Sequence, residues 1–91
     1  MRLRLVFFYS QTSGQCRRTE AHLAHTLQRR KNRARFELVR VEVEERPDLA
    51  ERFRIEAVPT LVVIDGRRVV GRIVSPSTAA ELALGLRAWL V

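Results

Sequence analysis

The amino-acid sequence predicts an α/β fold in which a four-stranded mixed sheet lies between helices. In the first half of the chain, apolar strand patterns alternate with helical patterns, which favours parallel strands joined by a right-handed crossover. In the second half, two apolar strand patterns flank Asp65-Gly66, a dipeptide typical of a tight hairpin turn. The expected order of elements is therefore βαβαββα, with parallel and antiparallel strands in one sheet.

The first predicted unit consists of a strand, a loop and a helix. Residues 3–9 form a short apolar and aromatic run, which is typical of a strand buried on both faces. A polar cluster at residues 10–14 ends this run and indicates a loop. Over residues 15–30 the leucines lie four positions apart, as on one face of a helix, and Thr12 or Ser13 can cap its start.

Three more strands follow from the apolar pattern. Residues 36–43 alternate apolar and charged side chains, which favours a strand with one wetter face. Consecutive apolar β-formers fill residues 60–64, and residues 68–74 continue beyond the Asp65-Gly66 turn. We expect these two hairpin strands to pair antiparallel and to occupy the centre of the sheet.

Two further helices are predicted from their first residues. Pro47 opens a short helix that stops near residues 54–56, since a proline is tolerated where the N–H has no helical partner. Thr78 and Glu81 form a capping box, and the helix that they begin is expected to continue to Leu90, so that the chain ends inside it.

Length and cysteine content exclude several function classes. A chain of 91 residues is expected to form one domain, spanning residues 1–91. Its single cysteine excludes an internal disulfide framework, a thiolate metal cluster and any reaction that cycles two thiols within the monomer. The first apolar run is too short for a signal sequence or a membrane span. We therefore expect a cytoplasmic protein without a membrane partner.

The net charge of +7 comes almost wholly from sixteen arginines, against one lysine. These arginines are spread along the chain, and only residues 29–35 form a dense run, which we interpret as a solvated turn at the far end of the sheet from the cysteine. Phosphate or RNA contact there is the weaker alternative, so a nucleic-acid partner is not expected. His22 and His25 are interpreted as exposed helix residues, because too few ligands accompany them for a metal site. No metal or cofactor is expected.

Three segments in register resemble the thioredoxin family. Residues 6–9, Val-Phe-Phe-Tyr, lead into residues 13–17, Ser-Gly-Gln-Cys-Arg; residues 57–61 read Ala-Val-Pro-Thr-Leu, and the Asp65-Gly66 turn follows. Thioredoxins have an apolar strand leading into Cys-Gly-Pro-Cys-Lys, a Val/Ile-Pro-Thr segment whose proline is cis and faces the active site, and then a hairpin. The resemblance covers essentially the whole chain, without the extra N-terminal strand and helix of full-length members. It implies a thioredoxin-like fold.

This sequence departs from the family at the positions that carry the chemistry. Ser13 stands where the family has its nucleophilic cysteine, and Cys16 stands at the second, resolving position. Because a serine hydroxyl neither forms nor accepts a disulfide, a lone Cys16 cannot close the dithiol cycle. The resemblance also indicates three other substitutions. Thr12 stands at the tryptophan before the motif, Phe7 at the buried acid that assists proton transfer, and Ser75 at the glycine of the substrate loop.

The resemblance implies a site with two parts. Cys16 and Ser13 would carry the chemistry, and a helix N-terminus would favour a thiolate at Cys16, with help from neighbouring arginines. A peptide-binding surface would be formed by Gly14, Gln15, Val58, Pro59 and Thr60, with the backbone of Val58 left to pair with an extended peptide. Two plainer interpretations stay open: Cys16 is a small buried hydrophobe, and Pro59 only marks the start of a strand.

Three functions follow as hypotheses. In the first, Cys16 forms mixed disulfides with a protein or a low-molecular-weight thiol, without conventional disulfide reductase activity. In the second, the groove around Ser13, Val58 and Pro59 binds a peptide without catalysis. In the third, Ser13 supports binding of a thiol such as glutathione, as a serine does in some glutathione transferases.

Overall fold

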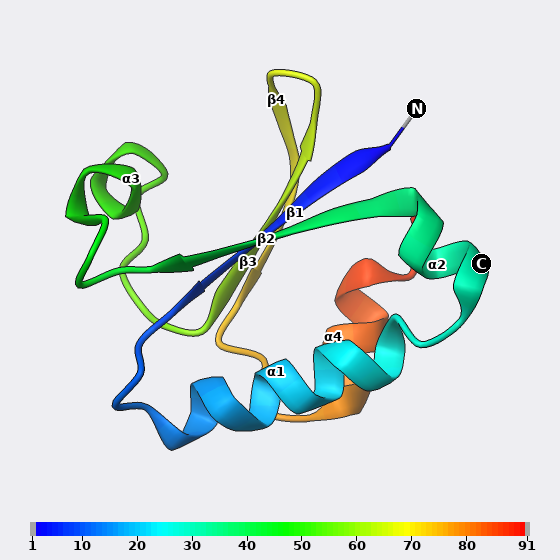
Figure 1. The fold of residues 1–91 in the computed structure, drawn as a ribbon, viewed down its shortest axis with the longest axis horizontal. Helices are drawn as coiled ribbons and strands as arrows, with labels where there is room; N and C mark the ends of the chain where they lie inside the picture. Colours follow the sequence, from blue (N-terminus) through cyan, green and yellow to red (C-terminus); the bar gives the residue numbers. More distant parts are fainter. Residues whose placement is uncertain (1, 91) are drawn as a thin grey trace.

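The structure is a computed structural model that describes residues 2–90. The described residues form a four-stranded sheet with the order β2-β1-β3-β4 (Figure 1). Its strands are β1 (Leu3–Tyr9), β2 (Phe36–Glu42), β3 (Thr60–Asp65) and β4 (Arg68–Val74). Strand β1 pairs parallel with β2 and antiparallel with β3, which in turn pairs antiparallel with β4. The predicted mixed sheet is confirmed.

Helices cover both faces of this sheet. Within residues 2–90 they are α1 (Gly14–Thr26), α2 (Arg30–Arg35), α3 (Pro47–Arg52) and α4 (Ala79–Leu86). Helices α1 and α4 pack side by side on one face, and α3 lies on the other (Figure 1). None of the helices in this described part is long and apolar enough to cross a membrane.

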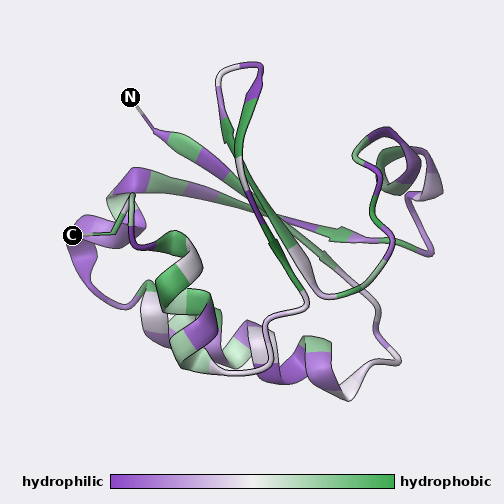
Figure 2. Cartoon of the chain, turned by 180° about the vertical axis from the view of Figure 1, so that it is seen from behind, coloured by the Kyte–Doolittle hydropathy of each residue, from purple (hydrophilic) through white to green (hydrophobic). Residues whose placement is uncertain are grey.

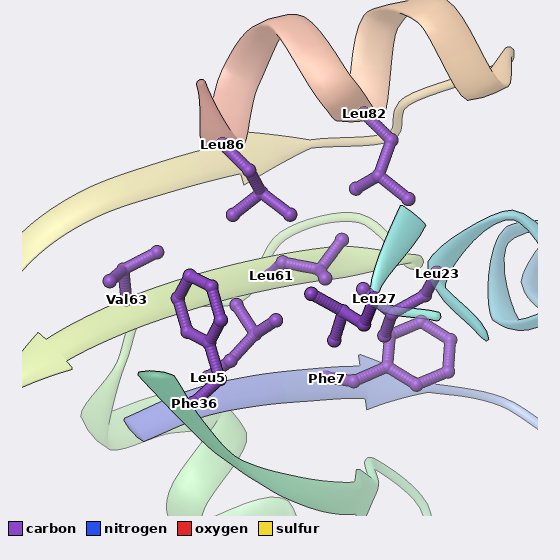
Figure 3. Close-up of a cluster of buried hydrophobic side chains, with 9 residues drawn as sticks. All are labelled: Leu5, Phe7, Leu23, Leu27, Phe36, Leu61, Val63, Leu82 and Leu86. Atoms are coloured by element: carbon purple, nitrogen blue, oxygen red, sulfur yellow. The ribbon is translucent and has the colours of Figure 1, made fainter. Parts of the chain in front are cut away.

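Side chains of β1 and β3 alternate between two apolar clusters. Leu5 and Phe7 of β1 and Leu61 of β3 face the leucines of α1 and α4 (Figure 3). Their neighbours Val6 and Phe8 face α3. The central strands are therefore apolar on both faces, and Figure 2 shows them largely in the hydrophobic colour. The prediction of a strand buried on both faces is confirmed for β1.

The region after α1 differs from the prediction of one helix over residues 15–30. Helix α1 ends at Thr26, and Arg29 has an extended backbone, with φ −65° and ψ 131°. A separate short helix, α2, then contains most of the arginine-rich run that was predicted as a turn. The run consists largely of good helix formers but has no apolar period that would indicate a helix. Asn32 on α2 is buried, so this helix is not fully solvated. The observed order is βααβαββα.

Two other expectations were wrong at the C-terminal end. Helix α4 ends at Leu86, and residues 87–89 form a turn, although Trp89 and Leu90 still pack against the cluster under α1 and α4. The hairpin strand β4 lies at an edge of the sheet, because β1 takes the central place beside β3. The cap of α4 is confirmed: Thr78 Oγ1 accepts the Glu81 N–H at 3.1 Å.

Candidate functional site

Sheet register brings three loops to one edge of the sheet. Phe8 near the end of β1 pairs with Thr60 at the start of β3, and Thr60 pairs with Val74 at the end of β4. The loop after β1, the segment before β3 and the segment after β4 therefore lie at the same edge. The residues that the sequence singled out at this edge lie in these three segments, at the start of α1 and at the start of β3.

Ser13 is the N-cap of α1. Its backbone is extended, with φ −95° and ψ 118°, and its Oγ accepts the backbone N–H of Cys16 at 3.2 Å. The Ser13 N–H donates to the Ser10 carbonyl at 3.2 Å, which closes the turn that leads into the helix. One of the two caps considered from the sequence is thereby confirmed, and Thr12 instead contacts Ser10 Oγ at 3.0 Å.

Cys16 lies in the first turn of α1 and is buried. Only 2% of its surface is exposed, and it forms no disulfide. The Ser10 N–H donates to Cys16 Sγ at 3.5 Å, so the sulfur lies against the backbone at the end of β1. Ser10 is itself buried and was not identified from the sequence, where it is only one of several polar residues in the loop.

Two arginines extend over the start of α1. A Cβ atom on Gly14 would lie 3.4 Å from Arg18 Nη1 and 3.7 Å from Arg17 Nη2, so both guanidinium groups lie close to this glycine. Arg17 Nη1 also donates to the Gln11 carbonyl at 3.3 Å. The first turn of α1 has no acidic residue. This end of the helix therefore offers backbone N–H groups and positive charge to an anion.

The second predicted motif lies in the segment between α3 and β3, directly before β3 begins at Thr60. The Val58–Pro59 peptide bond is cis, and Pro59 is buried. The Pro59 carbonyl accepts the Ser75 N–H at 2.7 Å, and Thr60 Oγ1 donates to the Ala57 carbonyl at 2.6 Å. Val58 is partly exposed, and its backbone N–H and carbonyl make no hydrogen bond within residues 2–90.

The segment after β4 links the two motifs. The Pro76 carbonyl accepts hydrogen bonds from Gln15 Nε2 and Thr19 Oγ1 of α1, both at 3.4 Å. Ser75, one residue earlier, is the donor to Pro59. A hydrogen-bonded path thus runs from α1 through residues 75–76 to the cis proline. Thr19 and Pro76 had no signal in the sequence, because the pairing depends on how α1 packs beside the segment that follows β4.

Ser75 has a backbone conformation that glycine favours. Its φ is +47°, in the left-handed region that costs a residue with a Cβ atom about 1 kcal/mol or more. The resemblance to thioredoxins placed a family glycine at this position. The strain is located in the segment that joins α1 to Pro59.

Among residues 2–90, the side chains needed for proton relay by a buried acid and for metal binding are absent. Phe7, at the position of the family's buried acid, is fully buried and stacks on Tyr9 with ring centroids 5.5 Å apart. No carboxylate can relay a proton from that position. Among residues 2–90, no group of three histidine, cysteine or acidic side chains could hold a metal ion. His25 is exposed and His22 partly so.

Comparison with known proteins gives a match to one family. The sequence model of the thioredoxin family, described as Thioredoxin, matches residues 1–88 of this chain. Comparison with curated proteins gives no match.

Solved structures of thioredoxins have a similar fold. Oxidized mitochondrial thioredoxin 3 from Saccharomyces cerevisiae is 24% identical, with a TM-score of 0.80 over 94% of this chain and 77% of that chain. Thioredoxin from Fasciola hepatica is 24% identical, with a TM-score of 0.81 over 97% and 81%. Oxidised thioredoxin from Plasmodium falciparum is 19% identical, with a TM-score of 0.82 over 99% and 83%. At these identities the similarity shows the fold.

Proposed function

The chain belongs to the thioredoxin family, and from this premise we propose that it takes part in thiol–disulfide chemistry through one cysteine. Cys16 forms a mixed disulfide with a protein or a low-molecular-weight thiol, and the chain has no dithiol turnover. The observation that carries the proposal is the position of Cys16 in the first turn of α1, with Ser13 as the cap three residues earlier. Thioredoxin-family proteins act with protein or thiol partners, and we expect this partner in the cytoplasm.

The proposed reaction is a thiol–disulfide exchange with an external disulfide. The Cys16 sulfur, after losing its proton to solvent, attacks one sulfur of that disulfide. A new S–S bond forms, the old one breaks, and the second sulfur leaves as a thiolate that takes up a proton. Cys16 is oxidised and the external sulfur is reduced. A second external thiol attacks the mixed disulfide and restores Cys16, because Ser13 cannot do so.

Burial of Cys16 makes loop movement a part of this proposal. With 2% of its surface exposed, Cys16 meets a disulfide only when the loop over it moves. Gln11 and Thr12 at the tip of that loop are exposed. Within residues 2–90, Thr12 forms hydrogen bonds only with Ser10 Oγ, and Gln11 accepts one from the exposed Arg17. The loop is thus held by few interactions, which supports opening as the step that limits reaction.

Intact mass spectrometry after incubation with glutathione disulfide tests the first step. We expect one glutathionyl group on the native protein and none on Cys16→Ser. An unmodified native protein that becomes modified in urea would show that the thiol is only a core residue, and the proposal would be wrong.

Insulin reduction with dithiothreitol tests the absence of dithiol turnover. We expect a negligible rate for the natural chain and a measurable rate for Ser13→Cys, which restores two thiols at the start of α1. The double variant Ser13→Cys with Cys16→Ser is the matched control and should again be inactive. Substantial turnover by the natural chain would contradict the proposal.

Peptide binding at the cis proline is the second candidate function. The unpaired backbone of Val58 favours it, because an extended peptide can add hydrogen bonds there as a new strand does. This function needs no thiol. Partners retained by Cys16→Ser would support it over the mixed disulfide, whereas their complete loss would count against it.

Binding of a thiol tripeptide at Ser13 is the third candidate. Ser13 Oγ accepts the Cys16 N–H, and the hydrogen of the hydroxyl is left to donate to a sulfur. Glutathione binding that persists in Cys16→Ser and is lost in Ser13→Ala would favour this candidate.

A further inference from the structure

A hollow of about 800 Å³ lies on the sheet face opposite α1 and α4. Its lining extends from the six-residue α3 to the turn between β3 and β4. Its floor is apolar and includes Val6 of β1, Val39 of β2 and Ile64 of β3. At its rim, Val69 of the edge strand β4 has 49% of its surface exposed.

The polar side chains that line this hollow are all arginines. They come from β1, from α3 and the residues after it, and from the β3–β4 hairpin: Arg4, Arg52, Arg54, Arg67 and Arg72. No acidic side chain among residues 2–90 lines the hollow. Five of the sixteen arginines in the chain therefore meet on one concave surface, which the even spread of arginine along the sequence does not reveal.

Most of these arginines lack an acidic partner. Arg4 pairs with the exposed Glu37 at 3.5 Å, and the guanidinium of Arg72 donates to the Phe53 carbonyl at 2.7 Å. In the part of the chain that the structure describes, Arg52 and Arg67 form no ion pair. Their charges repel one another across the hollow, and a ligand with several carboxylates would relieve this repulsion.

We propose that this hollow binds an acidic segment of a partner protein, with apolar side chains along one face and carboxylates along its edges. The apolar side chains would cover the partly exposed Val39 and the exposed Val69. The carboxylates would pair with the arginine heads at the rim, which hold two oxygens in a fork. Such a ligand would use both properties of the lining, whereas a small inorganic anion would leave Val39 and Val69 exposed.

The same lining argues against nucleic acid as the occupant. Single strands bind to exposed aromatic faces on which bases stack. The lining has two aromatic residues: Phe8 is fully buried, and the partly buried Phe53 packs its ring against Phe8 with centroids 5.6 Å apart. A charged but aliphatic hollow suits a peptide with leucine-like side chains better than it suits bases.

A binding titration with a synthetic peptide tests the proposal. The probe is a fluorescein-labelled peptide of about 15 residues, with leucines on one helical face and glutamates elsewhere. One control peptide has glutamine in place of glutamate, and the other has the same composition in shuffled order. We expect the full chain to bind the probe more tightly than either control, with NMR shift changes centred on Val39, Arg52 and Val69.

Two charge-reversed variants of the full chain make the test specific. Arg52→Glu with Arg67→Glu should weaken binding of the probe about tenfold or more. Arg30→Glu with Arg33→Glu on α2 changes the net charge equally and should leave binding within about twofold. Thermal unfolding of both variants checks that they fold.

Three results would overturn the proposal. If both variants weakened binding of the probe equally, the affinity would depend only on the net charge of the chain. Equal binding of the glutamine peptide would exclude recognition by the arginines. Failure of the probe to bind, together with arginine-dependent binding of a single-stranded RNA or of phosphatidylserine vesicles, would assign the hollow to a different class of partner.

Discussion

Ser13 Oγ accepts the backbone N–H of Cys16 at 3.2 Å, so the residue in place of the family's first thiol caps the helix that holds the second. Serine is among the best N-cap residues, because its oxygen satisfies an N–H group that has no partner within the helix. The substitution therefore removes redox chemistry from this position while it supplies a local stabilising contact.

Replacement of Ser13 by alanine should destabilise the chain. Loss of a serine cap typically costs about 1 kcal/mol, which urea unfolding would report as a lower midpoint with an unchanged slope. Ser13→Asp keeps an accepting oxygen at the cap and is the matched control, which should stay close to the natural chain. Equal stability of Ser13→Ala and the natural chain would mean that the cap contributes nothing.

Cys16 should react slowly with a thiol reagent in the folded protein. With 2% of its surface exposed, the sulfur meets a reagent such as Ellman's only through opening of the chain. The rate should rise steeply in urea, and Cys16→Ser should show no reaction. Immediate, complete reaction without denaturant would place the thiol at the surface and contradict the structure.

Sequence patterns indicated the sheet, the caps and both motifs, because these depend on neighbouring residues. Asp65-Gly66 forms its turn locally, and Ser13 and Thr78 cap helices that begin one residue later. The end of α1 and the existence of α2 were missed, because the arginine-rich run has no apolar period and its one buried residue, Asn32, is polar.

Contacts within the site were less accessible to sequence reasoning. The hydrogen bonds of Pro76 with Gln15 and Thr19 join residues about sixty positions apart. Such pairing follows only from the packing of α1 beside α4 and the end of β4. From the sequence, Cys16 could be either a buried core residue or a thiolate stabilised at the start of a helix. Its burial in the structure depends on the same packing.

Replacement of Ser75 by glycine should stabilise the protein. Ser75 has φ +47°, and glycine adopts this region without the Cβ clash, so we expect a gain of about 0.5–1 kcal/mol. Gly66→Ala is the matched opposite change: Gly66 has φ +63° with open space around it, so the expected loss of about 1 kcal/mol comes from the backbone alone. Thermal unfolding measures both, and a loss of stability in Ser75→Gly would show that no strain is stored there.

Asp48 should titrate below the ordinary range of aspartate. The Arg46 guanidinium donates to both carboxylate oxygens, at 3.1 and 3.0 Å, and this hydrogen bonding lowers the pKa of Asp48. Because the pKa is lower in the folded state, the pair favours folding above the unfolded pKa, and this contribution fades as pH falls through the folded value. NMR titration should show the pKa of Asp48 rising in Arg46→Gln and unchanged in Arg52→Gln. An unchanged value in Arg46→Gln would refute this assignment of cause.

A side chain at Gly71 of β4 is predicted to displace the ring of Trp89, which covers this glycine. A Cβ atom at Gly71 would lie 2.5 Å from the tip of the indole ring, closer than atoms can approach, so Gly71→Ala must displace the ring. Trp89 is the only tryptophan, so its fluorescence reports this movement directly. We expect a red shift of emission and a loss of about 1–3 kcal/mol in stability.

Gly85→Ala is the control for that experiment. A Cβ atom on Gly85 would meet the side chain of Ile73 at 2.8 Å, so this variant should also lose stability. It leaves the indole contact of Gly71 intact, and its emission should stay near that of the natural chain. Comparison of the two variants thus distinguishes two effects. Crowding of α4 against β4 lowers stability in Gly85→Ala, whereas displacement of Trp89 shifts the emission only in Gly71→Ala. An unshifted emission in Gly71→Ala would mean that the chain beyond α4 does not pack on β4 in solution.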